Sequence, residues 1–206
     1  EIEYAYHLMA SRCGIEMMPC RLLEIRGEQH FLTQRFDRIS GQKIHTATLN
    51  SLCGPTHAYE DIFKAARQLG VPHSDIEQLY ARTVFNFLAG VCDDHDKNFS
   101  FTMNQDGLWR LSPSYDLTFT VNLKNPFIGD RHAMTVNGKE RNVTRDGFLR
   151  LAETNDIRGA GLIIERIEEA VRSFPSIASA IPVAKPVIDI VAQHLTPNQG
   201  VYVSSP

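Results

Sequence analysis

The residues best suited to chemistry lie in the stretch 92–98, which reads Cys-Asp-Asp-His-Asp-Lys-Asn. Three carboxylates, an imidazole, an ammonium group and an amide stand side by side there, and one further acid, Asp116, follows later in the chain. Like charges this close repel one another, so a loop that serves folding alone would rarely contain them. The plain alternative is a solvated helix cap and turn, where Asp and Asn are common. We interpret the stretch as a functional site.

The spacing of the polar residues narrows the chemistry. Asp93 and Asn98 stand five positions apart, the interval of the D-x-x-x-x-N loop in kinases. There the Asp meets the hydroxyl group that attacks a phosphate, and the Asn carbonyl oxygen is a hard ligand suited to Mg²⁺. Residues 99–103 and 108–111 alternate as strands around an Asp-Gly turn and predict a hairpin. Because a hairpin brings its ends together, we expect Asn98 and Asp116 to reach one metal ion that binds the phosphates of ATP.

A buried helix must fix this loop. Residues 74–91 repeat apolar side chains with helical period, and Ser74 with Glu77 forms the pattern of a capping box. Helices are also predicted over residues 1–13, 60–69, 148–153, 161–174 and 188–195, and hairpins over 20–36 and 133–141. Residues 40–59 read as a long loop, 117–123 as a strand, and 196–206 as a loose tail.

Composition sets limits on the class of protein. The 206 residues are 43% hydrophobic, which is enough for a sizeable core. The net charge of −3 gives no reason to expect a nucleic-acid surface. We find no long apolar run, no signal peptide and no zinc spacing among the four cysteines, so we expect a cytoplasmic chain with free thiols and no membrane partner. The first residue is not Met, and we expect that an N-terminal portion precedes it.

Two motifs carry a resemblance to a known family. Residues 84–100, which contain Phe85-Asn86 and the Asp93–Asn98 loop, and the string Leu-Ser-Pro-Ser-Tyr-Asp-Leu at 111–117 resemble the C-terminal kinase region of HipA-like toxins. The resemblance runs over about residues 1–192. The D-x-H-x-x-N form is also similar to the catalytic loop of lipid-kinase-like folds. The resemblance to HipA-like toxins implies an α+β, protein-kinase-like fold. In that fold residues 1–38 are the remainder of the N-lobe and hinge, 39–195 are the helical C-lobe, and 196–206 are a tail.

The resemblance also implies roles for single residues. Asp93 is expected to be the catalytic base, and Asn98 and Asp116 the ligands of Mg²⁺. Nucleotide contacts are implied for two groups of residues. The first comprises the loop residues His95, Asp96, Lys97 and Asn98, together with Asp116. The second is Gln34, Arg35 and Phe36, in a segment that resembles the (E/Q)-R-F-D-R hinge, where backbone groups hydrogen-bond the adenine. Glu3 resembles the helix Glu that pairs with an ATP-binding lysine. Asp94 departs from the small residue common at its position.

The implied function is an ATP- and Mg²⁺-dependent serine/threonine protein kinase that is the toxin of a bacterial toxin–antitoxin system. Its expected partners are a protein substrate such as an aminoacyl-tRNA synthetase, whose phosphorylation inhibits translation, and an antitoxin that alone contacts DNA. The 206 residues contain no Gly-rich loop and no strand lysine, so we expect them to be inactive alone.

Two other functions remain open on the sequence. A metal-dependent phosphohydrolase of the His-Asp type would use His95-Asp96 with Asp93 and Asp116 as metal ligands, although such sites need the His-Asp pair on a helix. A degenerate kinase would act only as a binding module.

Overall fold

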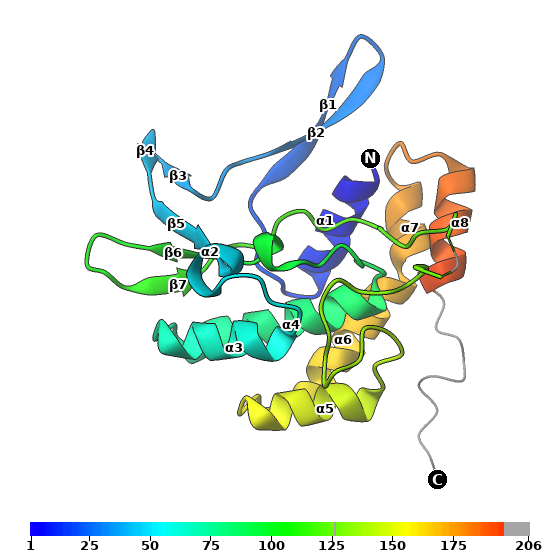
Figure 1. The fold of residues 1–206 in the computed structure, drawn as a ribbon. Helices are drawn as coiled ribbons and strands as arrows, with labels where there is room; N and C mark the ends of the chain where they lie inside the picture. Colours follow the sequence, from blue (N-terminus) through cyan, green and yellow to red (C-terminus); the bar gives the residue numbers. More distant parts are fainter. Residues whose placement is uncertain (126, 196–206) are drawn as a thin grey trace.

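The computed structural model describes residues 1–125 and 127–195, so the tail expected at 196–206 lies outside the described residues. Helices form the lower and right-hand parts of the molecule in Figure 1, and short antiparallel strands form its upper left. The fold is therefore a mixed α and β one, as expected. Within the described part of the chain no helix combines the length and apolar character that a bilayer crossing requires.

The first hairpin extends away from the helices. Helix α1 (Ile2–Arg12) leads to strands β1 (Cys20–Ile25) and β2 (Glu28–Thr33), which pair antiparallel. Arg26 and Gly27 both take positive φ angles, 53° and 83°, which gives the tight turn that a two-residue hairpin loop needs. The predicted helix and hairpin are thus confirmed, and the hairpin projects from the body of the molecule (Figure 1).

The long loop predicted over residues 40–59 is wrong. The segment contains strands β4 (Gln42–Lys43), which pairs with β3 (Arg38–Ile39), and β5 (His45–Thr48), followed by helix α2 (Leu49–Cys53). Strand β5 pairs with β6 (Ser100–Met103), which pairs with β7 (Trp109–Leu111) in the predicted second hairpin. The side chains of β5 are polar or small, so its sequence carries no apolar alternation that would reveal a strand.

Helix α4 (His73–Leu88) is largely buried and runs through the core beside α3 (Tyr59–Gln68). The predicted capping box is not formed, because the N-cap residue is Pro72 and Ser74 already lies inside the helix. The next residue, Asp75, instead accepts hydrogen bonds from Arg110 (2.8 Å to both nitrogens) and from the backbone N–H of Leu111 (2.8 Å). The N-terminus of α4 is thereby joined to β7.

The chain after Asp116 takes a less regular path than predicted. No strand forms over residues 117–123, and the hairpin predicted over 133–141 is reduced to one bridge around the Asn137-Gly138 turn. Backbone hydrogen bonds hold this segment against the loop instead, for example from Ala133 N–H to the Cys92 carbonyl (3.0 Å). Four helices complete the fold: α5 (Arg145–Thr154), α6 (Ala160–Arg172), the unpredicted α7 (Phe174–Ser179) and α8 (Lys185–Leu195).

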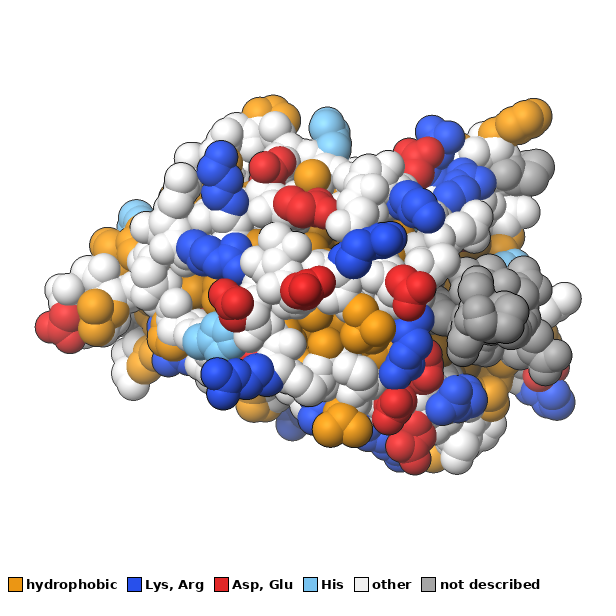
Figure 2. Space-filling view, turned by 90° about the horizontal axis from the view of Figure 1, so that it is seen from below, with side chains coloured by type: hydrophobic (Ala, Val, Ile, Leu, Met, Phe, Trp, Pro, Cys, Tyr) orange, Lys and Arg blue, Asp and Glu red, His pale blue; other side chains and the backbone are white. Residues whose placement is uncertain are grey.

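Charges of both signs are mixed on the lower face of the molecule, as far as the described residues form it. Figure 2 shows Lys and Arg side chains interspersed with Asp and Glu there. This agrees with the small net charge of −3.

Replacement of Asp75 by Ala should lower the free energy of unfolding by about 2–3 kcal/mol, because the buried Leu111 N–H then loses its acceptor. Asp189→Ala, which breaks an exposed pair with Lys185 on α8, should cost less than about 0.5 kcal/mol. Urea unfolding of both variants measures the difference. Equal values would show that Asp75 does not anchor β7.

Candidate active site

The loop after α4 leaves Asp93 facing solvent. The helix ends at Leu88, and Gly90 reverses the chain with a positive φ of 63°. The backbone N–H groups of Cys92 and Asp93 both donate to Thr120 Oγ1, at 2.7 and 2.9 Å. The Asp93 side chain is 66% exposed, and its Oδ1 lies 3.9 Å from His95 Nε2. The backbone of Asp93 is therefore held in place while its carboxylate faces solvent.

Asn98 is oriented by the loop itself. Its Nδ2 donates to the Asp93 carbonyl oxygen at 2.9 Å, which turns the amide oxygen Oδ1 away from that contact. His95 caps the short 3₁₀ helix η1 (Asp96–Asn98), where its Nδ1 accepts from the Lys97 N–H at 3.3 Å. The ring of His95 thus shapes the loop through Nδ1.

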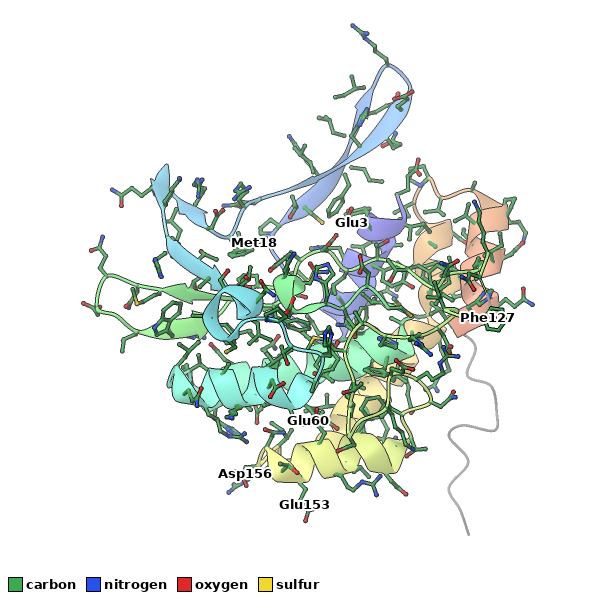
Figure 3. The ribbon with its side chains drawn as sticks, viewed as in Figure 1. Glu3, Met18, Glu60, Phe127, Glu153 and Asp156 are labelled. Atoms are coloured by element: carbon green, nitrogen blue, oxygen red, sulfur yellow. The ribbon has the colours of Figure 1, made fainter. Side chains whose placement is uncertain are left out.

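The structure brings Asp116 to the same place as Asn98, because both residues line one small pocket. Asp116 is exposed and takes a positive φ of 56°, which is uncommon outside glycine and is held by its surroundings. Glu3, at the start of α1 (Figure 3), is partly buried; burial first, and then the charge of Asp116, raise the pKa of its carboxyl group. The amide oxygen of Asn98 and the carboxylate of Asp116 are hard oxygen donors, the kind of ligand that Mg²⁺ prefers, and these two residues would hold such an ion.

Two carboxylates of the loop are used for anchoring. Asp96 is buried, and its Oδ2 accepts from Asn50 Nδ2 (2.9 Å) and from the Thr56 N–H (3.0 Å). Burial works to raise the pKa of Asp96, but these two hydrogen bonds, together with the neighbouring His95 and Lys97, outweigh burial, and the pKa is lowered. The carboxylate of Asp96 thus ties the loop to α2 and to the residues after it.

Asp94, whose role the sequence left open, is fully enclosed. Its Oδ2 accepts from the Tyr59 hydroxyl at 2.6 Å and meets His132 Nδ1 at 2.8 Å, and its Oδ1 accepts from the Ala133 N–H at 2.9 Å. The His132 ring stacks on Phe87, with 3.8 Å between ring centroids. Sequence reasoning missed Tyr59 and His132, because nothing local to either residue points to a partner far along the chain.

Tyr115 joins the loop to the expected hinge. Its hydroxyl donates to the Lys97 carbonyl (2.8 Å), so the 2.6 Å contact with Ser100 uses the serine as donor. Its ring stacks on Phe36, with 5.3 Å between centroids and 24° between planes. Sequence reasoning named the neighbour Asp116 but not Tyr115.

The other hinge residues are placed by local contacts. The backbone N–H of Gln34 donates to the Pro19 carbonyl at 3.0 Å. The guanidinium of Arg35 forms a two-point hydrogen bond with Asp37, at 2.8 and 2.7 Å. Of the three hinge residues, Phe36 is the one whose side chain reaches Tyr115.

The hypothesis of a metal-dependent phosphohydrolase of the His-Asp type gains no support from this geometry. Nδ1 of His95 and Oδ2 of Asp96 are both engaged with neighbours, and His95 is the N-cap of the short 3₁₀ helix that begins at Asp96. Over residues 1–125 and 127–195 no group of three or more His, Cys, Asp or Glu side chains is arranged to hold a metal ion. A kinase needs no such cage, because phosphate oxygens and water complete its Mg²⁺ shell.

The fold is of the protein-kinase-like class, and comparison with solved structures agrees. The chain matches HipA from Shewanella oneidensis MR-1, solved with HipB and operator DNA, at a TM-score of 0.71 and 17% identity over 94% of this chain and 52% of that one. It matches the Helicobacter pylori proinflammatory kinase CtkA at a TM-score of 0.66 and 16% identity, over 94% of this chain and 77% of that one.

Sequence comparison identifies the family. The model of the HipA-like C-terminal domain matches residues 1–180, and the chain belongs to this family. Two relatives from Sinorhizobium fredii (strain NBRC 101917 / NGR234) are each 26% identical: "Putative kinase Y4dM", over 94% of this chain and 53% of the relative, and "Putative kinase Y4mE", over 80% and 43%. The chain thus spans about half the length of these curated relatives.

Replacement of Glu3 by Gln should stabilise the chain at neutral pH. Because folding raises the pKa of Glu3, the folded state binds the proton at higher pH than the unfolded state, so stability falls as pH rises from about 4.5 toward neutrality. The variant should lose this part of the pH dependence, and its melting temperature should gain more at pH 7 than at pH 4. Glu153→Gln, on α5 (Figure 3), is the control that should change little. An equal gain at both pH values would contradict the assignment.

Replacement of Tyr115 by Phe keeps the stack on Phe36 but removes the hydroxyl that joins Lys97 and Ser100. The free energy of unfolding should fall by about 1–2 kcal/mol. Tyr4→Phe is a matched control, because the contact of Tyr4 is a ring stack with His7 that the change preserves. Chemical unfolding of the two variants tests this, and identical losses would exclude a loop-fixing role for the Tyr115 hydroxyl.

Proposed function

We propose that this chain is the catalytic region of an ATP- and Mg²⁺-dependent serine/threonine protein kinase. The observation that carries the proposal is the convergence of Asn98 and Asp116 on one pocket beside the exposed carboxylate of Asp93. The three side chains come from a helix–loop junction and from the end of a hairpin, which is how the kinase chemistry of base and metal ligands is divided between two segments.

The proposed roles follow from the contacts. Asp93 orients and accepts the proton of a Ser or Thr hydroxyl, because its carboxylate faces solvent. Asn98 and Asp116 hold Mg²⁺, which when bound supplies positive charge to the phosphates of ATP. Lys97 is exposed and acts as a second, mobile charge for a phosphate oxygen. His95 and Asp96 contribute by fixing the loop that presents these groups.

The hinge segment completes the nucleotide site in this proposal. Gln34, Arg35 and Phe36 follow β2, and the stack of Phe36 on Tyr115 places this segment against the residue that precedes Asp116. Adenine binding there would use the backbone groups of the segment, since the Arg35 side chain is already paired with Asp37.

The biological role is proposed from the family and the structural neighbours. HipA of Shewanella oneidensis is solved in complex with HipB and operator DNA, from a toxin–antitoxin system. We infer that the full-length protein is a toxin that an antitoxin restrains, that DNA is contacted through that antitoxin, and that the substrate is a protein of the translation machinery such as an aminoacyl-tRNA synthetase. The 206 residues contain no Gly-rich phosphate loop, so we expect activity to need the longer protein.

ATP binding measured with and without Mg²⁺ on the full-length protein tests the proposal. Asp116→Asn should weaken the Mg²⁺-dependent affinity for ATP by about tenfold or more, because it weakens a direct metal ligand. Asp93→Asn should keep MgATP binding but lose phosphate transfer to protein serine or threonine by about 10²–10⁴-fold.

Asp106→Asn, in the turn between β6 and β7, removes the same charge outside the site and should leave both quantities unchanged. ATP hydrolysis without an acceptor protein would favour the hydrolase alternative. If the unaltered protein shows no metal-dependent ATP binding, the chain acts only as a binding module and the kinase proposal is wrong.

A further inference from the structure

Two buried polar side chains of α4 lie beneath the proposed metal ligands. Arg82 and Asn86 are one helical turn apart on the same face of the helix, and each is 3% exposed. Both line the small pocket that Asn98 and Asp116 also line. Nε and Nη2 of Arg82 and Oδ1 of Asn86 have no hydrogen-bond partner among the described residues. Buried polar atoms are nearly always paired, so these three atoms require an explanation.

The orientation of the Asn86 amide follows from counting protons. The Tyr59 hydroxyl has one proton, and it donates that proton to Asp94 Oδ2 at 2.6 Å. The same hydroxyl must therefore accept in its 2.9 Å contact with Asn86, which makes the partner atom Nδ2. Oδ1 of Asn86 is consequently an acceptor on the other side of the amide, and it needs a donor.

Arg82 supplies charge as well as donors. Burial lowers the pKa of Arg82 to about 10, and the charges of Glu16, Asp75 and Tyr115 oppose that effect. The guanidinium stays protonated at neutral pH, and within the described part of the chain its Nε and Nη2 have no hydrogen-bond partner. Its unpaired N–H groups are therefore strong donors in a place of low dielectric constant.

The pocket has the size and chemistry of a site for one ordered water. Its volume is about 10 Å³, close to the smallest space that holds a water molecule. A water there can accept from Arg82 and donate to Asn86 Oδ1, which satisfies both kinds of atom. The other walls are formed by residues 114–117 and by the loop and its flanks, so the helix, the loop and the segment that carries Asp116 meet at this point. The lining residues from the loop and its flanks are Val91, Asp94, Asn98 and Phe99.

We propose that Arg82 and Asn86 hold an ordered water beneath Asn98 and Asp116, and that Arg82 is a positioning residue for these two ligands. The residue does not touch metal or nucleotide; it supports, through the water, the segment that holds Asp116 at its positive φ angle. The positioning role rests on the proposed kinase function, whereas the water site does not.

A high-resolution crystal structure of the full-length protein tests the water site first. The expected result is a water within hydrogen-bond distance of Arg82 and of Asn86 Oδ1. Density that shows no water between the two side chains would overturn the proposal, whatever the protein's activity.

The positioning role is tested by ATP binding with and without Mg²⁺. Arg82→Met keeps the length of the side chain but removes its donors, and should reduce the Mg²⁺-dependent gain in ATP affinity by about tenfold or more while metal-free ATP affinity stays the same. Arg82→Lys, which keeps a charged donor, should restore part of the gain. An unchanged gain in folded Arg82→Met would overturn the positioning role.

Thr83→Val separates positioning from stability. Thr83 is buried on the same helix and donates to the Leu79 carbonyl at 2.8 Å, but it does not line the pocket. Its replacement should lower the melting temperature and leave the Mg²⁺-dependent gain intact. A loss of that gain in Thr83→Val equal to the loss in Arg82→Met would reduce Arg82 to a structural role. If the unaltered protein shows no Mg²⁺-dependent gain at all, the proposed function fails and the crystallographic test of the water stands alone.

Discussion

The arrangement of the site depends on how one short loop separates its like charges. Asp93, Asp94 and Asp96 would repel one another if all three faced the same side. Asp94 and Asp96 instead point inward, where hydroxyl, amide and backbone donors surround their oxygens, and Asp93 is left facing solvent. Hydrogen bonds to a buried carboxylate contribute about 1.5–3 kcal/mol each, so the inward pair fixes the position of the outward one.

The anchors of the loop come from distant parts of the chain. Asp94 binds Tyr59 on α3 and His132 in the segment after Asp116, whereas Asp96 binds Asn50 on α2. The irregular segment after Asp116 is held by these contacts and by backbone bonds such as Ala133 to Cys92, without a strand ladder. A loop fixed from several sides keeps side chains near one geometry, which the proposed catalytic base and metal ligands would require.

Helix α4 supports the site at both ends. At its N-terminus Asp75 binds Arg110 and Leu111 of β7, which fixes the hairpin that leads to Asp116. At its C-terminus Arg82 and Asn86 reach the pocket under Asn98 and Asp116, and Asn86 also joins the Tyr59–Asp94 pair. One rigid helix therefore places the hairpin, the loop and the segment that carries Asp116 relative to one another.

The sequence by itself determined what depends on neighbouring residues: the helical period of α4, the β6–β7 hairpin, and the Asp93-to-Asn98 spacing with Asp116 after it. Only the tertiary structure decided the rest. Strand β5 forms because β6, far along the chain, supplies its partner. Helix α4 begins one residue before Ser74, and the side chain of Asp75 binds Leu111 of β7. The partners of Asp94 and Asp96, and the shared pocket of Arg82 and Asn98, likewise come from segments that meet only on folding. Such contacts carry no local period or turn signal, because their energy is gained only when distant surfaces pack.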